Sequence, residues 1–178
     1  MHNIIAIFLI AVGLSMDAFS LSILYGTLGF SKKRVFGLSL IVGVFHFFMP
    51  LLGSVVGDVI LRFLPVNQDL IVGVIFMVIA VEMIASTFKE EEVMNIVGLG
   101  SLLLFGFTVS IDSFSVGIGL SVISNNYIVA VGIFSIISTL FTFLGLVIGK
   151  KLNSVFGKYA TWIGSIILII LSILYIFN

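Results

Sequence analysis

Hydrophobic residues fill six long segments of the chain, and polar or charged residues gather in the short stretches between them. The segments cover approximately residues 3–26, 35–62, 68–88, 95–123, 126–149 and 158–177. An α-helix needs about 20 mostly apolar residues to cross a bilayer, and each segment is long enough. The segments use up nearly the whole sequence. The pattern therefore predicts one membrane domain, residues 1–178, built from six transmembrane helices.

The composition supports a membrane protein and excludes several kinds of site. Of the 178 residues, 61% are hydrophobic and 9% are charged, whereas a soluble domain is usually about one quarter charged. The absence of cysteine excludes disulfides, thiolate metal sites and cysteine nucleophiles. The net charge is zero, and no basic tract is long enough to indicate nucleic acid binding. The lipid bilayer is an expected partner, and the oligomeric state stays open.

Positive residues lie almost entirely in alternate connections between the segments. Those that follow the first, third and fifth segments are Lys32, Lys33, Arg34, Lys89, Lys150, Lys151 and Lys158. Only Arg62 falls on the other side. Because connections rich in Lys and Arg stay in the cytoplasm, these three connections are predicted to be cytoplasmic and both termini to lie outside. Residues 89–94 are then an acidic cytoplasmic loop.

A short sequence in the first segment recurs in the fourth. Ser15-Met-Asp-Ala-Phe-Ser-Leu-Ser-Ile23 is matched, 95 positions later, by Ser110-Ile-Asp-Ser-Phe-Ser-Val-Gly-Ile118. Further matches join Leu52–Gly57 to Leu144–Gly149 at an offset of 92, and Gly73 to Gly164 at an offset of 91. Residues 1–88 and 95–178 are therefore predicted to be two copies of a three-helix unit.

An odd number of helices in each copy fixes how the two copies relate. The second copy must enter the membrane from the opposite side, which gives inverted repeats. Many secondary transporters have this architecture, with a substrate site near the midplane where the repeats meet. The predicted fold class is an all-α polytopic membrane protein with six transmembrane helices arranged as two inverted three-helix repeats.

Both copies of the repeated sequence place an aspartate inside an apolar segment. A carboxylate there costs about 2.5–3.5 kcal/mol even on lenient insertion scales, so two in matched motifs indicate one shared task. Each aspartate shares a helix face with small or hydroxyl-bearing residues: Gly13 and Ser20 beside Asp17, and Thr108, Ser115 and Gly119 beside Asp112. Oxygen ligands without thiolates suit Mg²⁺, Ca²⁺ or Mn²⁺. The alternative is a pair of acids that only cap or join helices.

A second set of candidates lies in the second and third segments. Pro50 has no N–H, so a kink there would expose the His46 carbonyl oxygen, with the imidazole and the Met49 thioether as further metal ligands. Glu82 has His46 as its candidate partner, and such a pair exchanges protons near neutral pH. The alternatives are a plain proline kink with a packed histidine, Met49 as core filler, and Glu82 at the membrane interface. The equivalent stretch of the second half, Ile170-Leu-Ser-Ile-Leu174, has no acid.

The paired Ser-(Met/Ile)-Asp motifs, the six segments and Met49-Pro50-Leu-Leu-Gly53 resemble the bacterial manganese efflux pump family over essentially the entire chain. The resemblance implies export of Mn²⁺ across the bacterial plasma membrane by acidic membrane residues, with Asp17 and Asp112 at the motif positions. Mn²⁺ is then the transported substrate, and no cofactor is expected. The family pattern is expected to have an acid or amide in place of His46 and Lys or Arg in place of Glu82, which would put this chain in a divergent branch.

Together these features predict a secondary transporter, not an enzyme, that exports Mn²⁺ or a related divalent cation through a midplane site with two aspartates. The acids also suggest proton coupling. A transporter of another small solute, such as an amino acid, would be expected to carry an Arg deep in a helix, which is not found here. An intramembrane aspartyl protease would be expected to show Tyr-Asp and Gly-x-Gly-Asp around its acids. A structural membrane protein would leave the cost of the buried acids unexplained.

Overall fold

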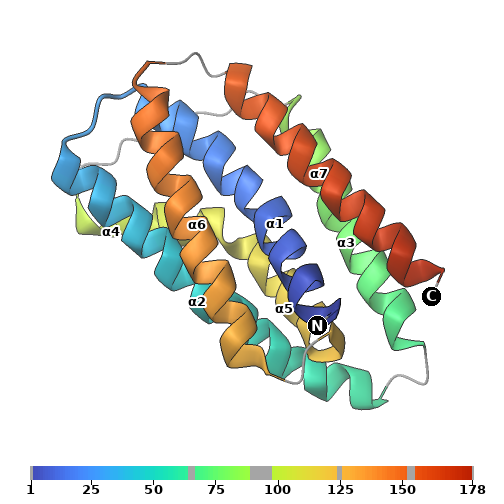
Figure 1. The fold of residues 1–178 in the computed structure, drawn as a ribbon. Helices are drawn as coiled ribbons and strands as arrows, with labels where there is room; N and C mark the ends of the chain where they lie inside the picture. The colour runs from blue at the N-terminus through green and yellow to red at the C-terminus, as the bar shows by residue number, and fades with distance from the viewer. Residues whose placement is uncertain (1, 64–66, 89–97, 124–125, 152–154, 178) are drawn as a thin grey trace.

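The computed structural model describes residues 2–63, 67–88, 98–123, 126–151 and 155–177, and α-helices joined by short turns make up this part of the chain (Figure 1). Its helices are α1 (His2–Gly26), α2 (Lys32–Phe63), α3 (Gln68–Ser86), α4 (Leu99–Val109), α5 (Ile111–Ile123), α6 (Tyr127–Gly149) and α7 (Val155–Ile176). Five of them are long and apolar enough to cross a membrane, and the bent pair of α4 and α5 brings the number to six if the pair is counted as one span. The predicted all-α polytopic membrane protein is confirmed.

The fourth predicted span differs from expectation because it is two helices. α4 and α5 meet at Ser110 with their axes bent by 42°. Ser110 has φ −110° and ψ 6°, and its hydroxyl donates to the carbonyl oxygen of Gly106 at 2.8 Å. Such side-chain bonds to the preceding turn can bend helices, although Ser39 and Ser165 make the same bond within continuous helices. The predicted acidic loop, residues 89–94, lies outside the described residues.

Pro50 and two asparagines show how local sequence shapes the other helices. α2 continues through Pro50 as one helix of 32 residues, so the proline does not end it.

α3 and α6 begin at asparagine caps: the Asn67 side chain accepts from the Asp69 N–H at 2.9 Å, and the Asn126 side chain accepts from the Val129 N–H at 3.4 Å. These caps satisfy amide groups that have no partner inside the helix.

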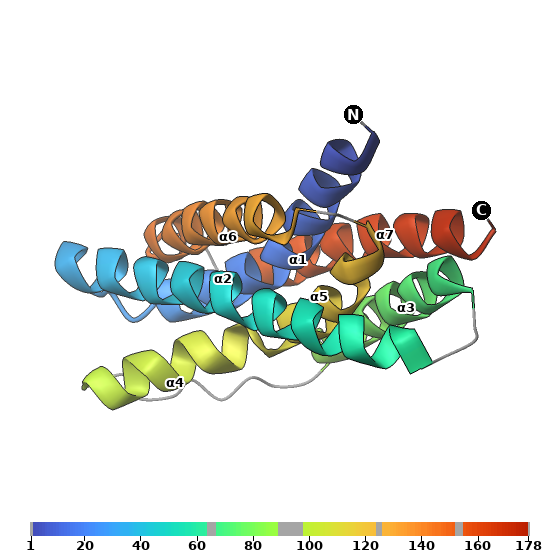
Figure 2. The same ribbon diagram turned by 90° about the horizontal axis from the view of Figure 1, so that it is seen from below.

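The helices of residues 1–88 pack mainly against those of residues 98–177. α1 packs along α6 and α7, α2 packs along α4, α5 and α6, and α3 packs along α5 and α7 (Figures 1 and 2). Among the described residues, no two of α1, α2 and α3 pack appreciably against each other. Most of the helix packing is therefore between the two parts of the chain and not within them.

Glycines allow the closest of these helix contacts. A Cβ added to Gly53 of α2 would lie 2.1 Å from the carbonyl oxygen of Phe114 in α5, and one added to Gly145 of α6 would lie 2.7 Å from that of Phe19 in α1. Phe19 and Phe114 are matched residues of the repeated sequence, and Gly53 and Gly145 are matched at the offset of 92. The α1–α6 and α2–α5 crossings thus use equivalent residues, and both need a bare backbone.

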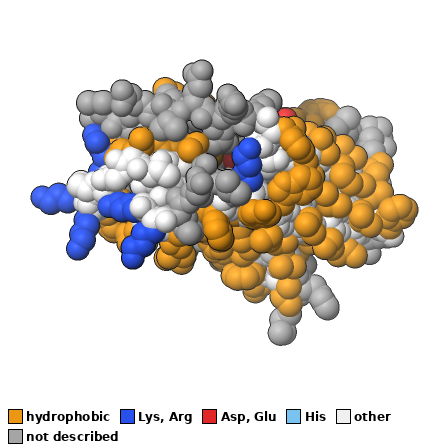
Figure 3. Space-filling model, turned by 90° about the horizontal axis from the view of Figure 1, so that it is seen from above, with side chains coloured by type: hydrophobic (Ala, Val, Ile, Leu, Met, Phe, Trp, Pro, Cys, Tyr) orange, Lys and Arg blue, Asp and Glu red, His pale blue; other side chains and the backbone are white. Residues whose placement is uncertain are grey.

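The outer surface is largely apolar, as expected for helices in contact with lipid, and its charges are unevenly placed. Lys and Arg side chains gather at the end of the molecule that holds the α1–α2 and α6–α7 connections (Figure 3). Both termini lie at the opposite end (Figure 1). This distribution separates a basic end of the bundle from an end with the two termini.

Candidate metal site

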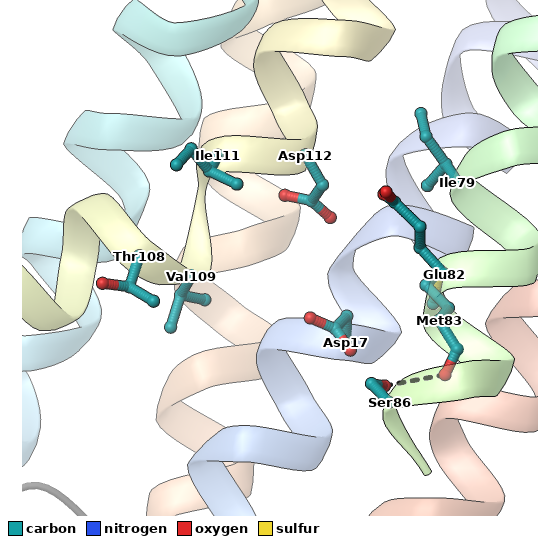
Figure 4. Close-up of a pocket in the computed structure, with 9 residues that line it drawn as sticks. All are labelled: Asp17, Ile79, Glu82, Met83, Ser86, Thr108, Val109, Ile111 and Asp112. Carbon is teal, nitrogen blue, oxygen red and sulfur yellow. Dashed lines mark hydrogen bonds between the residues drawn. The ribbon is translucent and has the colours of Figure 1, made fainter. Parts of the chain in front are cut away.

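A cavity of about 160 Å³ lies between α1, α3 and the break that separates α4 from α5 (Figure 4). Its lining consists of Asp17 from α1, then Ile79, Glu82, Met83 and Ser86 from α3, Thr108 and Val109 from α4, and Ile111 and Asp112 from α5. Among the described residues, the lining includes three acids and no basic side chain. A space of this size holds a small ion together with several water molecules.

Asp17 and Asp112 enter this cavity from different helices. Both side chains are half-buried, and both carboxylates are turned toward the same space (Figure 4). The two residues come from the two copies of the repeated sequence, 95 positions apart. The structure therefore brings together the two acids that the sequence singles out.

The break at Ser110 gives Asp112 a helix start that a continuous span would not supply. Asp112 lies in the first turn of α5, and one of its carboxylate oxygens accepts from the Ser113 N–H at 2.8 Å. The Ser113 hydroxyl is 3.5 Å from the same oxygen. The start of a helix carries a partial positive charge, which stabilises an ionised carboxylate in an apolar setting.

Glu82 supplies a third carboxylate from α3, and it does not pair with His46. Figure 4 shows its side chain reaching toward the space beside Asp112 and Asp17. His46 lies in α2, and α2 and α3 do not pack appreciably against each other within the described residues. The structure thus separates the predicted His46–Glu82 pair and places Glu82 with the two aspartates instead.

His46 contacts the first residue of the repeated motif. Its Nδ1 is 2.7 Å from the Ser110 hydroxyl and 3.0 Å from the Val42 carbonyl oxygen, and the whole side chain is buried. Its Nε2 has no hydrogen-bond partner among the described residues. Nδ1 close to a backbone carbonyl favours the tautomer that carries the proton on Nδ1 and leaves Nε2 as an acceptor.

An equivalent contact occurs in the other part of the chain, and sequence reasoning missed it. The hydroxyls of Ser15 and Ser138 are 2.9 Å apart and buried. Ser15 matches Ser110 at the offset of 95, and Ser138 matches His46 at the offset of 92 that also joins Gly53 to Gly145. Each motif serine is therefore tied to the equivalent position of a neighbouring helix, and the offset alone was the signal that could have revealed it.

The remaining sequence candidates are more scattered. Thr108 lines the cavity, but its hydroxyl points away from the carboxylates (Figure 4). Ser115, Ser20 and Met49 are not among the lining residues. The Ser20 hydroxyl faces α7, where it would lie 2.9 Å from a Cβ added to Gly157. The expected single face from Thr108 to Ser115 is divided by the break at Ser110.

The cavity has the chemistry of a cation site, although its acids do not form a closed coordination cage. Within the described part of the chain, no group of three or more His, Cys, Asp or Glu side chains is placed to hold a metal ion. Carboxylate and hydroxyl oxygens without thiolates suit ions such as Mg²⁺, Ca²⁺ and Mn²⁺. The arrangement is that of an open cavity in which an ion keeps part of its water.

The family model and the relatives that match this chain carry the same description. Residues 29–176 match the sequence model of a family described as "Mntp: Putative manganese efflux pump". Proteins named "Putative manganese efflux pump MntP" are similar along nearly their whole length. The one from Bacillus velezensis is 36% identical over 168 residues, with 94% of this chain and 91% of the relative covered. The one from Geobacillus thermodenitrificans is 34% identical, with 99% and 97% covered. No solved structure matches this chain.

Proposed function

The chain belongs to the manganese efflux pump family, and on this premise we propose that it is a secondary transporter that carries Mn²⁺, or a closely related divalent cation, out of the cytoplasm. The cavity in which Asp17 and Asp112 meet carries the proposal. Two carboxylates neutralise one divalent ion, which accounts for two acids in an apolar bundle. None of the described lining residues is Lys or Arg, which leaves those charges for a cation.

Other oxygen ligands complete the proposed ion site. Of the hydroxyl candidates Ser20, Thr108 and Ser115, only Thr108 lines the cavity. The last carbonyl groups of α4 end at the break beside Asp112, and the last turn of a helix leaves carbonyl oxygens without helical partners. Broken helices in transporters use such carbonyl ends to coordinate cations. His46 and Met49, which do not line the cavity, are assigned no contact with the ion in this conformation.

The two halves of the chain provide a route for alternating access. The matched Ser15–Ser138 and Ser110–His46 contacts and the matched glycine crossings support an inverted repeat that spans residues 1–88 and 95–178. The two motif helices differ in one respect. α1 is continuous at Ser15, whereas the helix of the second motif is broken at Ser110 into α4 and α5. Alternation then consists of an exchange, in which α1 bends and α4–α5 straightens.

The described conformation is assigned to the state that is open to the cytoplasm. Ser86, the last residue of α3, forms part of the cavity wall, and this end of α3 faces the proposed cytoplasmic side. Toward the termini, α1 packs tightly along α7, where a Cβ on Gly13 would lie 3.3 Å from the Gly164 carbonyl oxygen. The ion therefore enters past Ser86 and leaves only after α1 separates from α7.

Protons compete with the ion for the same oxygens. Metal binding requires carboxylates in their ionised form, so protonation from the outer side promotes release of the ion. We expect a counter-flow of protons for each ion exported, which a pH-sensitive dye enclosed in vesicles reports directly.

Substitution of the two aspartates tests the proposal. In purified protein reconstituted into lipid vesicles, Asp17→Asn and Asp112→Asn are each expected to reduce Mn²⁺ flux by at least about tenfold, because each removes one charge from the ion site. Asp69→Asn is the matched control, since Asp69 is a carboxylate on α3 that does not line the cavity. Wild-type flux in either cavity variant would refute the aspartate site.

A further inference from the structure

The position of Glu82 assigns it a more specific part in the transport cycle, and this inference rests on the proposed function. Ile79, Glu82, Met83 and Ser86 all line the cavity, and their spacing places them on one face of α3. Figure 4 shows the Glu82 carboxylate directed toward the space that Asp17 and Asp112 also face. The acids that line the cavity therefore come from three helices, α1, α3 and α5.

Only one half of the chain carries this third acid. Helix α7 occupies the place of α3 in the second half, since Gly164 of α7 matches Gly73 of α3 at an offset of 91. The sequence of α7 contains no Asp or Glu, and the stretch equivalent to the surroundings of Glu82 is Ile170-Leu-Ser-Ile-Leu174. Asp17 and Asp112 are duplicated, but Glu82 is not.

This asymmetry has a consequence for a protein whose halves exchange conformations. In the described state, the cavity wall opposite the two aspartates is α3 with Glu82. In the exchanged state, the equivalent wall is α7, which offers apolar and hydroxyl side chains in the same place. The cavity would then offer an entering ion three carboxylates on one side of the membrane and two on the other.

We propose that Glu82 is a capture ligand that acts on the cytoplasmic side only, so that the transporter binds Mn²⁺ more tightly where the ion enters than where it leaves. The number of charged ligands is a main determinant of the affinity of oxygen sites for divalent cations. Because binding and conformation are linked, the ratio of the Mn²⁺ affinities of the two states also favours the cytoplasm-facing state of the ion-bound protein, by the same factor. Proton binding from outside must then offset that preference before the ion is released.

The test compares the two sides of the membrane in one preparation. Vesicles that contain protein of known orientation are used to measure the KM for Mn²⁺ flux from the cytoplasmic face and, separately, from the outer face. Glu82→Gln is expected to raise the cytoplasmic KM about 10- to 100-fold, the range seen when a metal site loses a supporting group. The outer KM and the maximal rate from the outer face are expected to change less than about twofold.

Three controls make the result decisive. Glu82→Asp keeps the charge on a shorter side chain, so its cytoplasmic KM should fall between those of the wild type and Glu82→Gln. Asp69→Asn removes a carboxylate from the same helix outside the cavity and should leave both KM values unchanged. Asp17→Asn should abolish flux from both faces, since its carboxylate serves both states.

The outcomes separate this inference from the proposed function. If Asp17→Asn abolishes flux while Glu82→Gln changes neither KM, or changes both equally, the one-sided role of Glu82 is overturned and the transporter proposal stands. If the wild type moves no Mn²⁺, both are overturned. A cytoplasmic KM that rises alone supports both.

Discussion

At the scale of single residues, Ser110 and Ser15 show how one residue type in one motif serves two local structures. Both hydroxyls are buried, and each contacts a neighbouring helix through the equivalent position, His46 or Ser138. Only Ser110 also donates to the carbonyl oxygen of the preceding turn, and only its helix is broken. We expect the Ser110 hydroxyl to support the break that places Asp112 at the start of α5, through its combined contacts to Gly106 and His46.

Removal of the two hydroxyls should have unequal effects. Ser110→Ala removes contacts to both Gly106 and His46, and we expect it to lower the free energy of unfolding by about 2 kcal/mol or more. Ser15→Ala loses a single contact and should cost about 1 kcal/mol. Denaturant unfolding of the purified variants in detergent measures both values. An equal or larger loss for Ser15→Ala would show that the hydroxyl does not hold the break.

At the scale of helices, the crossings of α1 with α6 and of α2 with α5 depend on missing side chains. The backbone of α5 passes so near α2 that a Cβ on Gly53 would lie 2.1 Å from the Phe114 carbonyl oxygen, closer than any real contact. Pro50 takes part in the same crossing, since a Cβ on Gly117 would lie 2.3 Å from its carbonyl oxygen. These two helices cannot cross at this distance with larger residues.

Two alanine substitutions on one helix separate packing from helix propensity. Gly53→Ala should destabilise the protein by about 1–3 kcal/mol or more, because α2 and α5 must move apart. Gly37→Ala is the control on α2: a Cβ there meets nothing within 4 Å, and alanine is the better helix former. We therefore expect a lower midpoint of thermal unfolding for Gly53→Ala and an unchanged or higher one for Gly37→Ala. A similar midpoint for both variants would mean that the crossing relaxes easily.

The helices were largely predictable from the sequence, whereas their breaks and neighbours were not. Length and hydropathy suffice to find a span, and the six predicted segments correspond to α1, α2, α3, α4 with α5, α6 and α7. The break at Ser110 has no glycine or proline beside it, and the same Ser-x-Asp sequence is continuous in α1. Local sequence therefore could not distinguish the two.

The candidate site was also predictable in part: the sequence identifies its two aspartates but not the position of Glu82. The repeat and the cost of burial single out Asp17 and Asp112, and the structure places both in one cavity. The sequence pairs Glu82 with His46 only if consecutive helices are neighbours. In this fold, α2 and α3 follow each other in sequence but pack against other helices, so the surroundings of Glu82 depend on tertiary structure alone.

At the scale of the whole molecule, the basic end and the open cavity together define a direction. The cavity wall includes Ser86, and the Lys and Arg side chains of the α1–α2 and α6–α7 connections mark the end proposed to face the cytoplasm (Figure 3). The connection that contains Asn67 belongs to the opposite end. A chemical probe confined to one side of the membrane can test this direction.

The lack of native cysteine makes such a probe clean. We expect Ser86→Cys to react with a membrane-impermeant maleimide from the cytoplasmic side, and Mn²⁺ to slow the reaction because the ion fills the cavity. Asn67→Cys should react only from the outside. Labelling is read by a gel shift in right-side-out and inside-out vesicles. The reverse pattern would invert the proposed orientation, and reaction unaffected by Mn²⁺ would place the ion elsewhere.

The interlocked packing also governs how the chain is made. The ribosome delivers α1, α2 and α3 first, and these helices have almost nothing to pack against until residues 98–177 arrive. During that interval, Asp17 and the bare faces of Gly13 and Gly53 have no helix to cover them. Synthesis therefore has to reach α6 and α7 before α1 is enclosed by the helices that cover it in the folded protein.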